Sequence, residues 1–295
     1  MLVPHPIPYQ GSKRGIAKEI LPFFPKKFHR LVEPFAGSAA ISIAVASRWM
    51  TPIYWLNDAH QPLIKLWREI IDNGNKLADA YQDHWYAQAG NEREYFNEVR
   101  RQFNQSGKPA DFLYLLARCV KAAIRYNTKG EFNNTPDNRR KGTRPDEMRS
   151  RIQGVSALLN GKSTLTACHY VQVLEQCDAN DIVYMDPPYQ GVCKNRDQRY
   201  CPPFDHDEFC QWIDRLNSHN IRFVISYDGR TGEKIHGQSL PEELDLTRYE
   251  ISAGRSTQAT LLGRNEETIE SLYVSRNLME TKKRSLKKIT QKLLF

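Results

Sequence analysis

The run "DIVYMDPPYQG", residues 181–191, ends an apolar stretch with one acid, two prolines and a tyrosine. Pro187 and Pro188 have a fixed φ and no amide hydrogen, which makes the loop stiff and leaves carbonyl groups without a backbone partner. The carboxylate of Asp186 and the carbonyl of Pro187 are hydrogen-bond acceptors, and Tyr189 adds a flat aromatic face. Two acceptors beside a stacking ring match the exocyclic amino group of a planar base. The motif therefore predicts chemistry on the amino group of a nucleobase.

A second motif, "LVEPFAGSAA" at residues 31–40, has the pattern of a strand, a tight turn of small residues and a helix start. Gly37, together with the small Ser38 and Ala39, lets a ligand approach the backbone closely at the N-terminus of that helix. Asp58 follows Gly37 by 21 residues and ends the next apolar run, "PIYWLND". An acid in this place can accept hydrogen bonds from ribose hydroxyls. The pair predicts a site for a nucleoside cofactor.

Strand-like and helix-like segments alternate around these motifs, which indicates an α/β fold with a mostly parallel sheet. The strand-like runs are "RLVEPF", "PIYWLND", "STLTACHYV", "DIVYMDPPY", "IRFVISYDG" and "ESLYVS". A helix-like segment, 204–219, begins with Asp205 and Glu208 in the pattern of an N-cap box. Residues from about 62 to 160 are mainly helical and too long for a simple crossover. We expect them to form an inserted subdomain.

The distribution of charge points to a polyanionic partner. The net charge is +8, yet residues 281–295 alone carry six Lys or Arg and no acid. Residues 118–151 hold ten Lys or Arg against four acids, so the rest of the chain is slightly acidic. Positive charge confined to one internal segment and one tail is typical of nucleic-acid binding. A basic solvated surface without a partner is the simpler alternative.

Composition limits the remaining classes of protein. The mean hydropathy of −0.63 and the lack of a long apolar run argue against a transmembrane helix, and the N-terminus lacks the pattern of a signal peptide. We therefore expect a cytoplasmic protein. The six cysteines form no CxxC pair. Cys193, Cys201, His206 and Cys210 have poor spacing for a metal site, so we expect reduced thiols and no metal.

Taken together, "PYQGSK", "LVEPFAGS", "LND", "RYNTKGEFN" and "VYMDPPY" resemble the Dam-type (D12 class) N6-adenine DNA methyltransferases, in that family's order and over most of the chain. The resemblance implies a Rossmann-like methyltransferase fold that uses S-adenosyl-L-methionine and acts on double-stranded DNA as a monomer. It implies a catalytic domain of residues 1–61 and 161–281, a target-recognition insert of 62–160 and a basic tail of 282–295. One departure is Ala39, where the family often has a second glycine.

The resemblance also assigns roles to residues. Asp186, Pro187, Pro188 and Tyr189 would be catalytic, with Asp186 next to both the cofactor and the target base. Tyr9 and Lys13 would close over the cofactor, and Asp58 would bind its ribose. His169 and Tyr170 would flank its adenine. The segment that would hold its methionine part consists of Glu33, Pro34, Phe35, Ala36, Gly37 and Ser38.

The same resemblance indicates that the turn-rich part of the insert contacts DNA. A hairpin after "GEFN" carries Arg139, Arg140, Lys141 and Arg144, and an arginine there can bind guanine in the major groove or contact phosphates. Just ahead of it, the residues expected to support the loop or to fill the space left by a flipped base are Arg125, Tyr126, Asn127 and Lys129.

Three alternatives stay open at this level. The enzyme could methylate cytosine N4 or RNA, although cytosine enzymes more often resemble a Ser-Pro-Pro-Tyr pattern. It could also be a DNA-binding relative without activity, against which Asp58, Asp186 and Tyr189 all argue. The sequence specifies neither the recognition site nor whether a cognate restriction endonuclease accompanies the protein.

Overall fold

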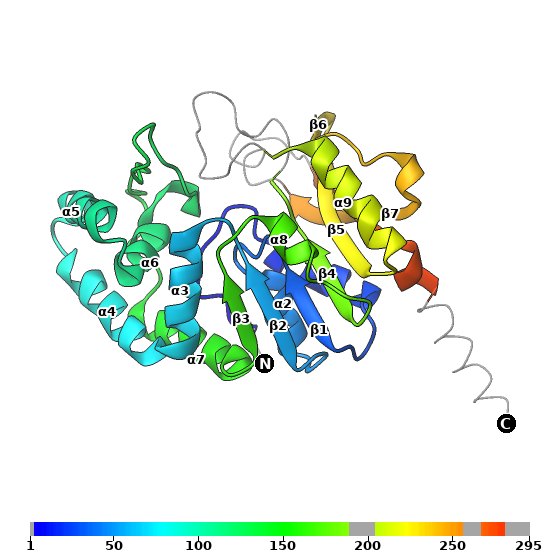
Figure 1. Ribbon diagram of the computed structural model, residues 1–295. Coiled ribbons are helices and arrows are strands. Elements are labelled where there is room, and N and C mark those ends of the chain that lie inside the picture. The colour runs from blue at the N-terminus through cyan, green and yellow to red at the C-terminus, as the bar shows by residue number, and fades with distance from the viewer. Residues whose placement is uncertain (1–2, 189–203, 256–266, 281–295) are drawn as a thin grey trace.

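The computed structural model describes residues 3–188, 204–255 and 267–280. Tyr189, Cys193, Cys201 and the basic tail of 282–295 lie outside the described residues. The described chain is built on one mixed sheet with helices on both faces (Figure 1). This confirms the predicted α/β class with a mostly parallel sheet and a mainly helical insertion.

The sheet has the strand order β3-β2-β1-β4-β5-β8-β7, with β6 paired to β5. The first five strands in this order are mutually parallel, whereas β8 is antiparallel to both β5 and β7. The bounds are β1 Arg30–Glu33, β2 Ile53–Asn57, β3 Ser163–Thr166, β4 Asp181–Met185, β5 Arg222–Thr231, β6 Lys234–His236, β7 Leu246–Arg255 and β8 Glu267–Ser275.

Side chains of the central strands alternate between two hydrophobic layers. In β4, Ile182 and Tyr184 belong to one cluster, whereas Val183 and Met185 belong to the other. All five residues of β4 are buried, as expected for a parallel strand with helices on both faces. The carboxyl end of this strand is therefore a rigid platform for the residues that follow it.

Different helices cover each face of the sheet. On one side lie η1 Lys13–Gly15, α1 Ala17–Ile20, η2 Leu21–Phe23 and α2 Ala40–Ala46. On the other lie α8 Tyr170–Leu174, α9 His206–Ser218 and η4 Glu242–Leu244. The insert between β2 and β3 consists of α3 Gln61–Asp72, α4 Gly74–Ala87, α5 Glu92–Ser106, α6 Pro109–Arg118, η3 Val120–Ala122 and α7 Pro145–Leu159.

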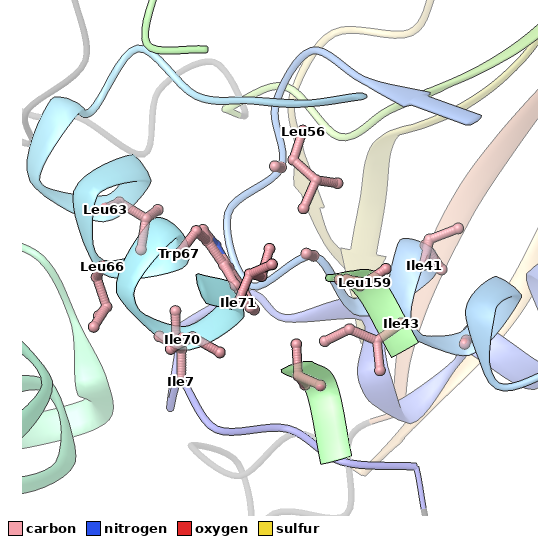
Figure 2. Close-up of a cluster of buried hydrophobic side chains, with 14 of the residues drawn as sticks. Ile7, Ile41, Ile43, Leu56, Leu63, Leu66, Trp67, Ile70, Ile71 and Leu159 are labelled. Carbon is pink, nitrogen blue, oxygen red and sulfur yellow. The ribbon is translucent and has the colours of Figure 1, made fainter. Parts of the chain in front are cut away.

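The insert shares a hydrophobic core with the sheet. Trp67, Ile70 and Ile71 of α3 pack in the same cluster as Ile43 of α2 and Leu56 of β2 (Figure 2). Within the insert α4 approaches α7 closely, because a Cβ on Gly74 would be only 2.9 Å from Ile152 Cγ2. The helices of the insert are thus fixed relative to the sheet and α2.

Some local expectations were wrong. Strand β3 ends at Thr166, and residues 170–174 form helix α8 instead of continuing the strand. His169 lies at the N-cap of α8 with an extended backbone. Strands β6 and β7 were not anticipated, because the polar sequence of 246–255 gave little apolar signal on one face.

Candidate active site at the carboxyl ends of the parallel strands

The loops that follow β1, β2, β3 and β4 surround a cavity of about 230 Å³. The cavity lies at the carboxyl ends of the parallel strands, where open α/β sheets bind ligands. It brings together all the predicted cofactor-binding and catalytic residues that the structure describes: Tyr9, Lys13, Glu33, Pro34, Phe35, Ala36, Gly37, Ser38, Asp58, His169, Tyr170, Asp186, Pro187 and Pro188. Tyr189 lies outside the described residues.

The turn after β1 is shaped by what packs against it. Gly37 has φ +48°, and a Cβ at this position would lie 3.2 Å from Cε1 of Tyr9. The Tyr9 ring therefore packs against the bare backbone of the turn, which only glycine allows without displacement. Trp67 Nε1 donates a hydrogen bond to the Gly37 carbonyl over 2.9 Å, and Ser38 Oγ lies 2.7 Å from Ser12 Oγ. Both the N-terminal segment and the insert thus hold the turn.

Ala39 follows this turn with φ +46° and is fully buried. A left-handed conformation is costly for a residue with a Cβ, which explains why glycine suits the position better. Ala39 is the N-cap of α2 and makes no side-chain capping bond. The first turn of α2 is capped instead from the neighbouring strand.

That cap is Glu33, the last residue of β1. Its Oε1 accepts a hydrogen bond from the Ser42 amide over 2.6 Å and satisfies a free donor of the first helical turn. Burial raises the pKa of Glu33 to about 8, and the nearby charge of Asp186 acts in the same direction. Glu33 therefore shapes the helix that lines the cavity, beyond the contact with a ligand that the sequence suggested.

Asp58 also has partners within the protein. Its Oδ2 accepts from the Gly37 amide at 3.0 Å, and its Oδ1 accepts from the His60 amide at 2.9 Å. Burial raises its pKa to about 6, against the opposing effect of these two hydrogen bonds. Each carboxylate oxygen has a further lone pair, so Asp58 can still accept from a ligand hydroxyl. The carboxylate links the two loops that a nucleoside would contact.

Asn57, next to Asp58, joins three loops at the cavity. Its Nδ2 donates to the carbonyls of Pro34 and Cys168 over 2.9 and 3.0 Å. Its Oδ1 accepts from Thr166 Oγ1 and from the Cys168 amide. A fully buried amide with this many partners fixes the ends of β1, β2 and β3 relative to one another.

Asp186 belongs to a small ionic cluster centred on Lys13. Its Oδ1 is 2.9 Å from Lys13 Nζ, and the same nitrogen is 3.2 Å from Oε2 of Glu270 on β8. Lys13 is almost completely buried, whereas the Asp186 side chain keeps 23% of its surface exposed. Burial raises the pKa of Asp186 to about 6; Lys13 opposes this rise and Glu270 adds to it. The carboxylate is thus mainly ionised at neutral pH.

An aromatic wall closes the other side of the cavity. The rings of Phe35 and Tyr170 are 5.0 Å apart, and Phe204 packs against both. Tyr170 donates its hydroxyl hydrogen to Glu208 over 2.9 Å. The expected N-cap box is therefore only half formed, because Asp205 caps α9 while Glu208 binds Tyr170.

The predicted position of the hairpin, after "GEFN", was wrong. The chain reverses earlier, at residues 127–131, where Tyr126 and Phe132 form an antiparallel bridge. Asn127 builds this turn, since its Oδ1 accepts from the amides of Lys129 and Glu131. The Tyr126 hydroxyl lies 2.7 Å from His60 Nε2, so Tyr126 supports the loop that follows Asp58. The side chain of Lys129 is exposed at the tip and that of Arg125 is half-buried.

The basic residues after this hairpin lie on a segment that is fixed to the insert through its backbone. Tyr81 donates to the Thr143 carbonyl and Gln88 donates to the Lys141 carbonyl. The exposed basic side chains along the segment are those of Arg139, Arg140, Lys141 and Arg144. Arg140 is 3.6 Å from Asp137 and Lys141 is 3.4 Å from Glu92. Among the described residues, Arg139 and Arg144 form no ion pair.

Across residues 3–188, 204–255 and 267–280, no group of three or more His, Cys, Asp or Glu side chains could hold a metal ion. Cys193 and Cys201 lie outside this part of the chain. His206 is buried, with Nδ1 2.8 Å from the Tyr227 hydroxyl and Nε2 near Cys210 Sγ.

Sequence reasoning missed several residues that build the site. Asn57 was part of the quoted "LND", and an amide that ends an apolar strand was a usable signal. Glu270 is an acid within the strand-like run "ESLYVS", but nothing in its spacing indicated Lys13 as its partner. Trp67 lies within helix α3, and His60 directly precedes this helix. Both become part of the site only through tertiary packing.

The fold and this cavity together define the class of enzyme to which the chain is similar. A mostly parallel sheet, a small-residue turn after β1 and an acid after β2 together match the Rossmann-like S-adenosylmethionine-dependent methyltransferases. The family model for D12 class N6 adenine-specific DNA methyltransferases matches residues 9–285. The chain therefore belongs to the D12 class N6 adenine-specific DNA methyltransferase family.

Individual relatives agree with this assignment. The chain is 25% identical to the Modification methylase StsI of Streptococcus sanguinis, over 94% of this chain and 44% of that protein. It is 29% identical to a DNA adenine methylase of Haemophilus influenzae, over 61% of this chain and 62% of the relative. The retron Ec67 DNA adenine methylase of Escherichia coli is also 29% identical, over 62% and 63%. The chain thus spans less than two thirds of the length of these relatives.

In the described part of the chain, no helix has both the length and the apolar composition needed to cross a membrane.

Proposed function

We propose that this protein transfers a methyl group from S-adenosyl-L-methionine to the N6 amino group of an adenine at a specific site in duplex DNA. The observation that carries the proposal is the position of Asp186, which ends the buried strand β4 and lines the same cavity as the Gly37 turn and Asp58. Membership of the D12 class family supports adenine as the base.

The cavity fits the cofactor that the family implies. The Gly37 turn offers a bare backbone, and Asp58 offers acceptors for ribose hydroxyls. Phe35, Tyr170 and His169 provide flat faces suited to an adenine ring. When bound, S-adenosylmethionine supplies an electrophilic methyl group and is released as S-adenosyl-L-homocysteine.

The residues of the DPPY motif would activate the target. The amino nitrogen of adenine is a poor nucleophile because its lone pair is delocalised into the ring. The Asp186 carboxylate and the Pro187 carbonyl each accept one amino hydrogen, which draws the nitrogen toward tetrahedral geometry and frees the lone pair. Asp186 must be ionised to accept, and its pKa of about 6 allows this at neutral pH. The site acts by positioning and by electrostatic complementarity.

The target must leave the duplex, because its amino group is inaccessible within the stack. Flipping an adenine out costs a few kcal/mol. Stacking on Tyr189, which lies outside the described residues, is worth about 1–3 kcal/mol and offsets much of that cost. The hairpin of residues 126–132, which is joined to the Asp58 loop through the Tyr126–His60 contact, is our candidate to fill the space that the flipped base leaves.

The division of labour follows the chain. We assign catalysis to residues 1–61 and 161–281, target recognition to 62–160 and nonspecific DNA attraction to the tail of 282–295. The exposed Arg139, Arg140, Lys141 and Arg144 support this assignment for the insert. We further propose a cytoplasmic monomer on DNA, and the likeness to a modification methylase supports a cognate restriction endonuclease as a partner.

The test is methyl transfer from tritiated S-adenosylmethionine to duplex DNA, followed by nucleoside analysis. We expect label in the N6-methyl-2′-deoxyadenosine released from DNA and in no other nucleoside. Label in N4-methylcytosine, label in RNA alone, or DNA binding without any transfer would each overturn it. Mapping modified bases in DNA from cells that express the protein then identifies the recognition sequence.

A further inference from the structure

Glu270 approaches the site from a strand that carries none of the predicted site residues. It lies on β8 opposite Gly229 of β5, next to a shift in the register of the two strands. A Cβ on Gly229 would be only 2.5 Å from the Ile269 carbonyl oxygen and 3.3 Å from the Glu270 Cα. Glycine at position 229 therefore permits the close approach of β8 that brings the Glu270 carboxylate to Lys13.

At this point Lys13 is held between two carboxylates. Its Nζ lies 2.9 Å from Asp186 and 3.2 Å from Glu270, and the Lys13 side chain is only 6% exposed. Other titratable groups near Asp186 in the described part of the chain are Glu33 of β1 and Tyr184 of β4. Neither carries a positive charge. Within residues 3–188, 204–255 and 267–280, Lys13 is the cation that contacts Asp186, and it contacts Glu270 as well.

We propose that Glu270 is a positioning residue that holds Lys13 and compensates its charge beside the methyl-transfer centre. This inference rests on the proposed function, because it assumes that Asp186 faces the methyl donor and the target amino group. Glu270 itself contacts Lys13 and not the reacting atoms.

The physical reason is the sign of the charges in the reaction. The methyl donor is a sulfonium cation, and the amino nitrogen gains positive charge as it is methylated. A buried ammonium group paired only with Asp186 would cancel the negative charge that stabilises both, since Coulomb interactions are strong where water is excluded. With Glu270 present the three groups together carry one net negative charge, which complements a single cation.

Binding provides the first test, by comparing two ligands that differ by one positive charge. Isothermal calorimetry gives the dissociation constants of S-adenosylmethionine and of the neutral S-adenosylhomocysteine for the full chain. In Glu270→Gln the preference for the cationic ligand should fall at least about threefold, because a compensating charge is lost. In Lys13→Met it should rise, because both carboxylates remain. If Glu270 acted only through packing, Glu270→Gln would weaken the binding of both ligands equally.

The control is Glu250→Gln on the neighbouring strand β7. Glu250 is exposed, pairs with Arg230 and lies opposite Ser271 rather than Glu270, so it faces away from the cluster. Its ligand preference should match that of the parent protein. Thermal melting verifies that each variant is folded. If Glu270→Gln is unstable, the ligand preference of Lys13→Met provides the test.

The pH dependence of single-turnover methylation provides the second test, because the reaction requires ionised Asp186. Glu270→Gln removes a neighbouring anion, so the acid limb should move to lower pH by about half a unit. Lys13→Met removes a cation, so the limb should move to higher pH. If the parent enzyme methylates DNA, shifts of the same sign in both variants, or no shift in either, overturn the role of Glu270 and leave the proposed function intact. A parent enzyme that binds neither ligand overturns the proposed function instead.

Discussion

The carboxyl edge of the sheet and the basic segment of the insert differ in how their functional side chains are held. At the sheet edge, Asp58, Asp186 and Glu33 are largely buried, and each has a defined partner within the protein. On the insert, Arg139 and Arg144 project into solvent from a backbone that is itself well anchored. A preorganised site of the first kind suits chemistry, because its groups need not reorganise during reaction. An exposed set of the second kind suits attraction to a polyanion over longer range.

The sheet edge meets another part of the insert, the hairpin of residues 126–132, at His60. Its amide donates to Asp58, and its Nε2 lies 2.7 Å from the hydroxyl of Tyr126 in the hairpin of the insert. Burial lowers the pKa of His60 to about 3, so the ring is neutral at physiological pH. A neutral ring at this junction joins the Asp58 loop and the hairpin without adding a charge beside Asp58.

The largest effect that would test this comparison comes from Asp186. In Asp186→Ala the amino group loses its charged acceptor, whereas the basic segment and its DNA contacts remain. Single-turnover methylation should fall by more than about a hundredfold, equivalent to about 2.7 kcal/mol, while DNA affinity stays within about threefold. Glu98→Ala, at a partly exposed acid on α5, provides the control. A residual rate within tenfold of the parent would show that the carboxylate does not activate the target.

Asp58 should give the next largest effect, on cofactor affinity. Asp58→Ala removes acceptors from the ribose and leaves the amides of Gly37 and His60 without their partner. We expect S-adenosylmethionine binding to weaken by about 1–3 kcal/mol, measured by calorimetry well below the melting temperature. Unchanged affinity in a folded variant would mean that Asp58 only supports the loops.

These two residues also show what could be predicted from sequence. Asp58 and Asp186 each end a short apolar strand, and parallel strands bring their carboxyl ends to one edge. A parallel arrangement and the position of each acid at the end of a strand therefore predict that both lie at one edge, and the structure shows both at one cavity. The α/β class followed from the same alternation of segments.

The remaining contacts depend on tertiary geometry. Glu33 binds the amide of Ser42, nine residues later, only because α2 folds back against β1. Glu270 meets Lys13 across 257 positions of sequence through a close approach at Gly229. The position of the hairpin was misjudged because the turn is built by Asn127 and its side-chain hydrogen bonds, whereas the charge pattern favoured a later segment.

A smaller effect is expected on stability, because buried Glu33 makes the free energy of unfolding depend on pH. The pKa of Glu33 is about 8 in the fold against an ordinary value of 4.5, so the folded state binds more protons between these values. Its contribution to stability is therefore fully present below about pH 4.5 and is lost as the pH rises through 8. Glu33→Gln should make the decline in unfolding free energy less steep by about 1 kcal/mol per pH unit, measured by urea denaturation. An unchanged slope would show that Glu33 is ionised in the fold.

Single residues of the basic segment should give the smallest effects, which sharpens the contrast with the sheet edge. The exposed side chain of Arg139 has no packing to fix its direction, so we expect it to contact phosphate. Arg139→Ala should weaken DNA binding by tenfold or less, evenly across sequences, and lower the slope of log affinity against log salt by about one unit. Arg48→Ala, an exposed arginine just after α2 and thus away from the cavity, should leave the slope unchanged. If Arg139→Ala instead relaxed the preference at one base pair with the salt slope intact, the side chain would read a base, and this segment would be as precisely oriented as the catalytic edge.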